Sequence, residues 1–153
     1  MHLAQLNIGR FKYPTTDPRM AGFMDNLDRV NAIAERSDGF VWRLKDETGN
    51  ATGIRPFADP DMAVNMSVWR DVESLEHYVW NTVHKQFYRK RDEWFQLMDK
   101  QHLVMWWIDE GHVPTLGEAE LRLDHLNANG NSDFAFGWSH LPHVKLWQQA
   151  RCA

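Results

Sequence analysis

The stretch from residue 62 to residue 95 changes its hydrophobic period once, and this change constrains the fold more than any other feature of the chain. Four aliphatic side chains between Met62 and Val68 occupy alternate positions, which predicts a strand over 62–69 with one aliphatic face. After Arg70 the apolar residues recur at helical spacing, and Asp71 is a suitable N-cap, so a helix is predicted over 71–98, with a kink expected at Asn81-Thr82. The chain therefore contains a strand that leads directly into a long helix.

The other segments repeat these two patterns. Asp17-Pro18 is typical of a helix start, and the predicted helix runs to about residue 36. Thr115 and Glu118 form a capping box that starts another helix, which Gly130 ends. Apolar alternation or continuous apolar runs predict the remaining strands over 2–8, 40–45 and 102–108, with a possible short strand at 134–136.

The predicted order of elements is β-α-β-β-α-β, which is the ferredoxin-like split plan of the α+β class. We expect one domain over residues 1–138 and a C-terminal extension over 139–153 that adds a short helix. Because two helices cover only one face of a single sheet, the aliphatic face of 62–69 needs another cover. A second copy of the chain is the simplest cover, so a homodimer joined sheet to sheet is predicted.

Composition excludes several classes of function. The net charge of −4 and the single short basic cluster at 89–91 argue against a nucleic-acid surface. No apolar run approaches the length of a membrane span, and the N-terminal residues lack a secretion signal. A lone cysteine excludes a disulfide framework and a cysteine zinc site, so a cytoplasmic setting is expected.

The polar faces of two predicted strands supply the first candidate site residues. Asn7 ends the first strand, and Asn65, Ser67 and Trp69 share one face of the strand over 62–69. These two strands are neighbours in a ferredoxin-like sheet, and Arg43 could join them from the next strand. Buried polar groups need partners, so the face is either an internal network or the floor of a ligand cleft.

The helix over 71–98 supplies the second set. His84 lies on an aromatic stripe with Trp80, and Tyr88 follows one turn later. A histidine in this setting is an acid/base group, an axial metal ligand, or a residue hydrogen-bonded at the edge of a core. Trp106, on the strand over 102–108, is a further candidate wall. The pair His140 and His143 has metal-like spacing but no third ligand nearby, so no metal site is expected.

Several of these segments resemble a known family. The stretches LAQLNIGRFKYP, NMSVWRDVESLEHYV, KRDEWF and MWWIDEGHVPTLGEAELRL are similar to the DUF3291 family, which has no established activity. The resemblance spans roughly residues 2–136 and implies the dimeric α+β-barrel superfamily. Fold relatives include antibiotic-biosynthesis monooxygenases and haem-degrading monooxygenases, but kinship of fold does not transfer function.

The haem-degrading relatives use an Asn on the first strand and then Trp and His on the second helix. Asn7 matches the first of these, whereas the helix gives no ungapped match to Trp and His together. The resemblance therefore implies only part of a haem site.

Three functions follow from these observations. The first is a small cofactor-independent enzyme, monooxygenase-like or isomerase-like, that acts on a hydrophobic or aromatic metabolite. In it His84 is the acid/base group, Asn7 and Asn65 polarise a substrate oxygen, and the substrate-binding residues are Arg43, Ser67, Trp69, Trp80, Tyr88 and Trp106. The second is a non-catalytic small-molecule-binding or stress-response protein, and the third is a haem protein with His84 as ligand.

Overall fold

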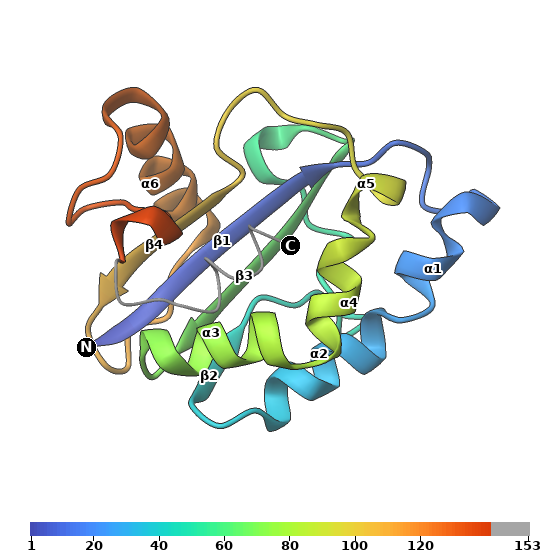
Figure 1. The fold of residues 1–153 in the computed structure, drawn as a ribbon. Helices are drawn as coiled ribbons and strands as arrows, with labels where there is room; N and C mark the ends of the chain where they lie inside the picture. Colours follow the sequence, from blue (N-terminus) through green and yellow to red (C-terminus); the bar gives the residue numbers. More distant parts are fainter. Residues whose placement is uncertain (142–153) are drawn as a thin grey trace.

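A four-stranded antiparallel sheet forms the centre of the computed structural model, which describes residues 1–141 apart from the side chain of Val83. The strand order is β2-β3-β1-β4, and Figure 1 shows β1 and β3 side by side in the middle. The bounds are β1 (His2–Arg10), β2 (Phe40–Arg43), β3 (Met62–Trp69) and β4 (Leu103–Ile108). The predicted α+β class is confirmed, and each predicted main strand is present with ends shifted by at most two residues.

The register of β1 on β3 separates two kinds of side chain. Leu6 lies opposite Met66 and Ile8 opposite Val64, so aliphatic groups share one face. Gln5 lies opposite Ser67 and Asn7 opposite Asn65, so polar groups share the other face. Because side chains alternate along a strand, a single register sets the chemistry of both faces.

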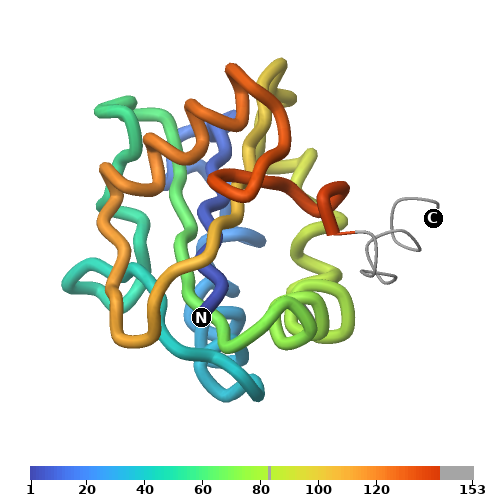
Figure 2. Tube along the Cα trace, turned by 90° about the vertical axis from the view of Figure 1, so that its left-hand side faces the viewer, coloured from blue at the N-terminus to red at the C-terminus, as the bar shows by residue number. Residues whose placement is uncertain are grey.

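The aliphatic face is covered from within the chain by α6 (Leu116–Asn129). Ala119, Leu123 and Leu126 of this helix share one core cluster with Met62, Val64, Met66 and Val68. Figure 2 shows α6 on one side of the strands and α3 on the other. The prediction that the aliphatic face of β3 needs a second copy of the chain as its cover is therefore wrong, because α6 of the same chain covers this face.

The opposite face carries the other helices. α2 (Leu27–Arg36) and α3 (Val72–Asn81) pack there through Val30, Ala34 and Leu75, together with the segment that follows α6. That segment includes η3 (Trp138–His140) and makes one isolated bridge, between Phe136 and Met105, in place of the possible strand over 134–136. The predicted added helix and His143 lie outside the described residues.

Two predicted long helices are broken into shorter ones. The helix from residue 18 to residue 36 consists of η1 (Pro18–Met20), α1 (Ala21–Met24) and α2. The helix predicted over 71–98 consists of α3, α4 (Val83–Arg89) and α5 (Arg91–Trp94), so it has a second interruption at Lys90 that was not predicted and ends at Trp94. The break after α3 falls at the expected kink, where Thr82 has the extended angles φ −120° and ψ −173°.

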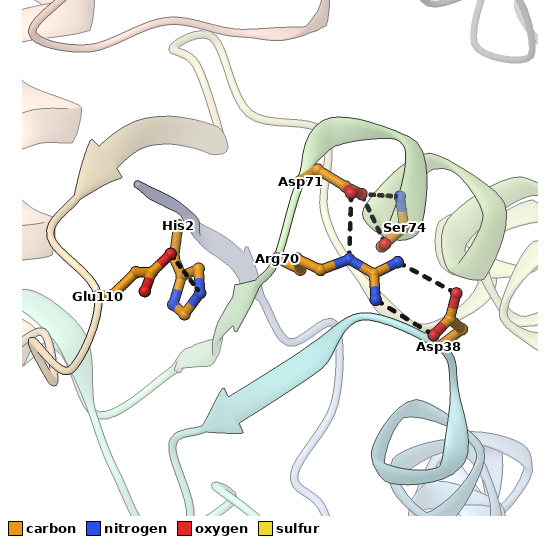
Figure 3. Close-up of polar contacts among 6 residues, drawn as sticks. All are labelled: His2, Asp38, Arg70, Asp71, Ser74 and Glu110. Carbon is orange, nitrogen blue, oxygen red and sulfur yellow. Dashed lines mark hydrogen bonds and ion pairs between the residues drawn. The ribbon is translucent and has the colours of Figure 1, made fainter.

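The predicted caps are present. Asp71 Oδ1 accepts hydrogen bonds from Ser74 N at 2.8 Å and Ser74 Oγ at 2.6 Å. Arg70 bridges Asp71 and Asp38, which ties the start of α3 to the turn before β2 (Figure 3). Thr115 Oγ1 accepts from Glu118 N at 3.1 Å, and Gly130 ends α6 with a φ of 75° that favours glycine.

The segment between β2 and β3 is mostly irregular, as predicted. It contains only η2 (Pro56–Ala58) and a turn in which Asp46 accepts from Thr48 N at 2.8 Å and Gly53 N at 2.7 Å. Ala51 and Ile54 pack against the α6-side core, and Ala51 and Thr52 also line a cavity on the other side of the sheet. The segment thus closes one side of the domain.

Leucine truncations on α6 test whether this helix covers the sheet. Leu123 is 2% exposed and Leu121 is 61% exposed. Leu123→Ala should lower the free energy of unfolding by about 2–5 kcal/mol, and Leu121→Ala by less than about 0.5 kcal/mol, in urea denaturation. Equal small effects would mean that α6 does not form the core contact and that another surface covers the aliphatic face.

Candidate functional site

A cavity of about 260 Å³ lies between the polar face of the sheet and the helices α2 to α5. Five of the residues predicted from the sequence line it together: Asn7, Arg43, Asn65, His84 and Tyr88. They come from three strands and one helix that are distant in sequence. The sheet order and the break after α3 bring them to one space.

The floor of the cavity is a hydrogen-bonded polar ladder. Gln5 Nε2 donates to Asn65 Oδ1 at 2.7 Å and to Ser67 Oγ at 2.8 Å. Gln5 and Ser67 are buried, whereas Asn65 is exposed and lines the cavity beside Asn7. The amide N–H groups of Asn65 make no hydrogen bond to another of the described residues, so they are available to a ligand. Ser67 is therefore a supporting residue that does not itself line the cavity.

Trp69 anchors the same network from below. Its Nε1 donates to Ser67 Oγ at 2.9 Å, and its ring stacks on Tyr78 at a centroid distance of 5.1 Å. Trp69 is fully buried and does not line the cavity. Contrary to the prediction, Trp69 is therefore not a wall of the cavity but supports Tyr78, which does line it.

Tyr78 links the floor to His84. Its hydroxyl donates to Val30 O at 3.2 Å, and its ring centroid is 4.9 Å from that of His84. Burial raises the pKa of this phenol, although the charge of Arg43 acts in the opposite sense. Tyr78 is consequently a neutral, fixed aromatic wall at physiological pH.

The helix break at Thr82 positions His84. Thr82 Oγ1 accepts from His84 N at 3.2 Å and donates to Tyr78 O, so one hydroxyl caps α4 and satisfies the end of α3. His84 Nδ1 lies 3.3 Å from Val79 O. A carbonyl only accepts, so Nδ1 carries the proton and Nε2 keeps its lone pair. Among the described residues, no partner is recorded for Nε2.

The surroundings of His84 keep its ring neutral. Burial lowers the pKa of His84 to about 4, and the hydrogen bond to Val79 opposes this only in part. A neutral imidazole with an open Nε2 accepts a hydrogen bond or a proton from a ligand hydroxyl.

Aromatic rings close the other end of the cavity. Phe11 stacks on Phe95 at 5.5 Å, and Phe87 contacts Phe23 at 5.3 Å and Trp94 at 4.9 Å. Gly9 permits this packing, because a Cβ there would lie 2.7 Å from Phe95 Cδ1. All five aromatic residues line the cavity. This end therefore favours an apolar, planar group.

Two predicted wall residues lie elsewhere. Trp80 is buried and packs edge-on against Tyr88 at 5.1 Å, on the side of α3 near Trp138 at 6.2 Å. Trp106 lies on the α6 face, where its Nε1 donates to Glu118 Oε2 at 2.9 Å. Neither lines the cavity. The break at Thr82 interrupts the stripe that related Trp80 to His84, and strand parity places Trp106 on the aliphatic face.

Sequence reasoning missed Gln5, Tyr78 and the aromatic end. Gln5 shares the parity of Asn7, so the alternation of β1 carried the signal that it belongs to the polar face. Phe11 had no such signal, because it lies just after the end of β1 and outside any regular strand. Phe23 lies on α1, where helical spacing indicates burial but not the space that the ring faces.

The described residues contain no group of three or more His, Cys, Asp or Glu side chains that could hold a metal ion. None of the helices within residues 1–141 is long and apolar enough to cross a membrane.

Comparison with known proteins assigns the chain to a family. The sequence profile of "Domain of unknown function (DUF3291)" matches residues 2–152. The chain belongs to the DUF3291 family. None of the curated proteins matches it. Among solved structures, it is similar to the crystal structure of PA3566 from Pseudomonas aeruginosa, with a TM-score of 0.44 and 16% sequence identity over 68% of this chain and 88% of that one.

The acid sensitivity of this DUF3291 protein tests the setting of His84. Its folded-state pKa of about 4 lies below the ordinary 6.5, so between these values the unfolded chain binds a proton that the folded chain does not. Stability should therefore fall as pH drops through this window, with a share of about 3 kcal/mol from His84. Urea denaturation between pH 4 and 7 measures this loss of stability, and the part that comes from His84 should be absent in His84→Gln.

The matched control is His77→Gln, because His77 is exposed on α3. It should keep the pH dependence of the wild type. Partial burial and then the Arg91 charge lower the pKa of His102 as well, and this contribution persists in both variants. If the free energy of unfolding of both variants depends on pH in the same way as that of the wild type, His84 is not buried in its neutral form.

Proposed function

We propose that this protein binds a small hydrophobic or aromatic metabolite in the cavity and acts on it as a cofactor-independent, monooxygenase-like or isomerase-like enzyme. The supporting observation is the cavity itself. It joins a polar floor at Asn7 and Asn65, an aromatic end, and a histidine with an open Nε2. Ligand sites typically combine such a mainly apolar enclosure with a few convergent polar groups.

The proposed chemistry starts with a proton transfer. A ligand hydroxyl or enol seated beside His84 donates its proton to Nε2, which leaves an electron-rich anion on the ligand. The amide N–H groups of Asn65 stabilise the oxygen on which that charge develops, and Asn7 lies across the strand pair from it. Tyr78 and Phe87 hold the ring plane, and the enclosure limits access of water.

The low pKa of His84 favours a second candidate, a binding protein without catalysis. A general base works best when its pKa is near the operating pH, and a value of about 4 makes a weak base at neutral pH. In this alternative His84 Nε2 only accepts a hydrogen bond from the ligand.

Haem is supported less well. Pockets for drug-sized ligands measure roughly 300–1,000 Å³, and a porphyrin needs a pocket of at least this size. A cavity of about 260 Å³ therefore does not fit haem. A haem titration that produces a Soret band lost in His84→Ala would reverse this assessment.

The finer features of fold and assembly are also proposals. The strand order β2-β3-β1-β4, antiparallel throughout, supports the ferredoxin-like split plan. The homodimer and the dimeric barrel remain predictions, although the aliphatic face, which α6 covers, no longer supports them. Analytical ultracentrifugation at micromolar concentration tests whether the protein is a dimer. A cytoplasmic location likewise remains a prediction.

Blocking the cavity tests the binding proposal. Asn65→Trp introduces a large ring at an exposed position in the cavity lining; it removes one hydrogen bond of Gln5, which keeps its bond to Ser67, so the melting temperature is measured alongside. Wild-type protein should bind a neutral aromatic probe, 2-naphthamide, in calorimetry, and Asn65→Trp should weaken binding at least about tenfold. Leu121→Trp, on the exposed face of α6, should bind like wild type. Unchanged binding by Asn65→Trp would contradict this location.

His84→Gln separates the enzyme from the binding protein. Native mass spectrometry of the purified protein identifies a retained metabolite, which then serves as the assay substrate. In the enzyme, His84→Gln should still bind this metabolite but lose at least about a hundredfold in turnover, as expected for a missing acid/base group. Binding with no turnover by the wild type would leave the binding protein as the function.

A further inference from the structure

We propose that Arg43 forms an anion subsite at one end of the cavity, so that the ligand is an aromatic acid whose carboxylate binds the guanidinium. This inference rests on the proposed function and adds the charge of the ligand to it. The sequence and the cavity by themselves are compatible with neutral ligands. The contacts of Arg43 are what favour a negatively charged one.

Arg43 is a nearly buried cation whose donors are only partly used. Its side chain is 11% exposed and lines the cavity. Nε donates to Glu35 Oε1 at 2.7 Å, and Nη2 donates to Gly49 O. A guanidinium has five N–H donors, so both protons of Nη1 and one of Nη2 have no recorded acceptor among the described residues. A ligand carboxylate can accept from these two nitrogens together.

The ion pair with Glu35 does not fully neutralise Arg43. The Glu35 side chain is 44% exposed on α2, so water screens its charge. The charge of Arg43 nevertheless reaches the cavity wall, since it acts on the pKa of the buried Tyr78 phenol. An anion inside the cavity would face this cation with less water between them.

The neighbouring groups suit the same ligand. Arg43 lies opposite Ser67 in the sheet, and Asn65 is two residues further along the same face of β3. The carbonyl oxygen of Asn65 accepts from Gln5, which directs its amide N–H groups to the cavity side as donors for a ligand. Arg43 and Asn65 therefore lie on the β2 and β3 side of the cavity, whereas Phe11, Phe23 and Phe95 pack on one another beside the end of β1. Arg91, the other arginine in the lining, stacks on Tyr88 and donates to its carbonyl oxygen. This polarity matches a ligand with a carboxylate at one end and a ring at the other.

A matched pair of probes tests the charge of the ligand. Calorimetry compares 2-naphthoate with 2-naphthamide, which share the ring and differ in the anionic group. Wild-type protein should bind the acid at least about tenfold more tightly, the usual scale of a charge-assisted hydrogen bond. Arg43→Gln should lose this preference while retaining its affinity for the amide.

Glu35→Gln is the matched control, because it breaks the same ion pair and leaves the cation in place. It should keep or increase the preference for the acid, whereas a merely structural role of the pair predicts the same loss in both variants. Melting temperatures confirm that both variants are folded.

The outcomes distinguish this inference from the proposed function. Equal affinity of wild-type protein for the acid and the amide would overturn the anion subsite and leave the cavity as a binding site. If neither 2-naphthoate nor 2-naphthamide binds to the wild-type protein at millimolar concentration, both the proposed ligand site and the anion subsite are contradicted.

Discussion

The pairing of β1 with β3 is the constraint on which the rest of the structure depends. One register places Leu6 opposite Met66 and Asn7 opposite Asn65. A slip by one residue would turn the aliphatic groups toward the cavity and the amides toward α6. The hydrogen bonds of buried Gln5 with Ser67 and Asn65 favour this register, because another pairing would leave the buried Gln5 and Ser67 side chains without these partners. The core and the candidate site are therefore two faces of one arrangement.

The break at Thr82 converts a covering helix into the wall of a site. An unbroken helix would have kept Trp80 and His84 on one stripe. Because Thr82 is extended, α4 starts afresh and His84 turns to Tyr78 while Trp80 stays in the packing around Trp138. The hydroxyl of Thr82 pairs with one backbone group at each helix end, the carbonyl of Tyr78 and the N–H of His84, which offsets part of the hydrogen bonding lost at the break.

The sequence was sufficient to predict what depends on local period. Alternation identified the strands, caps identified the helix starts at Asp17, Asp71 and Thr115, and parity grouped Asn7 with Asn65. It did not predict that α6 covers the aliphatic face, because an amphipathic helix does not state which surface it packs on. Trp106 was misplaced for a related reason, since a strand that is apolar on both faces does not indicate which face carries a site. The aromatic end joins Phe11, which follows β1 and has no periodic signal, to Phe23 on α1, whose helical spacing does not indicate which space it faces.

The central claim is that the space between Asn65 and His84 holds an aromatic ligand. A crystal structure of the protein grown with 2-naphthoate tests it most directly. Density for the ring is expected against Phe87 and Tyr78, with the carboxylate on the guanidinium of Arg43. Density for the compound only on the outer surface, with the cavity filled by protein side chains, would contradict the claim.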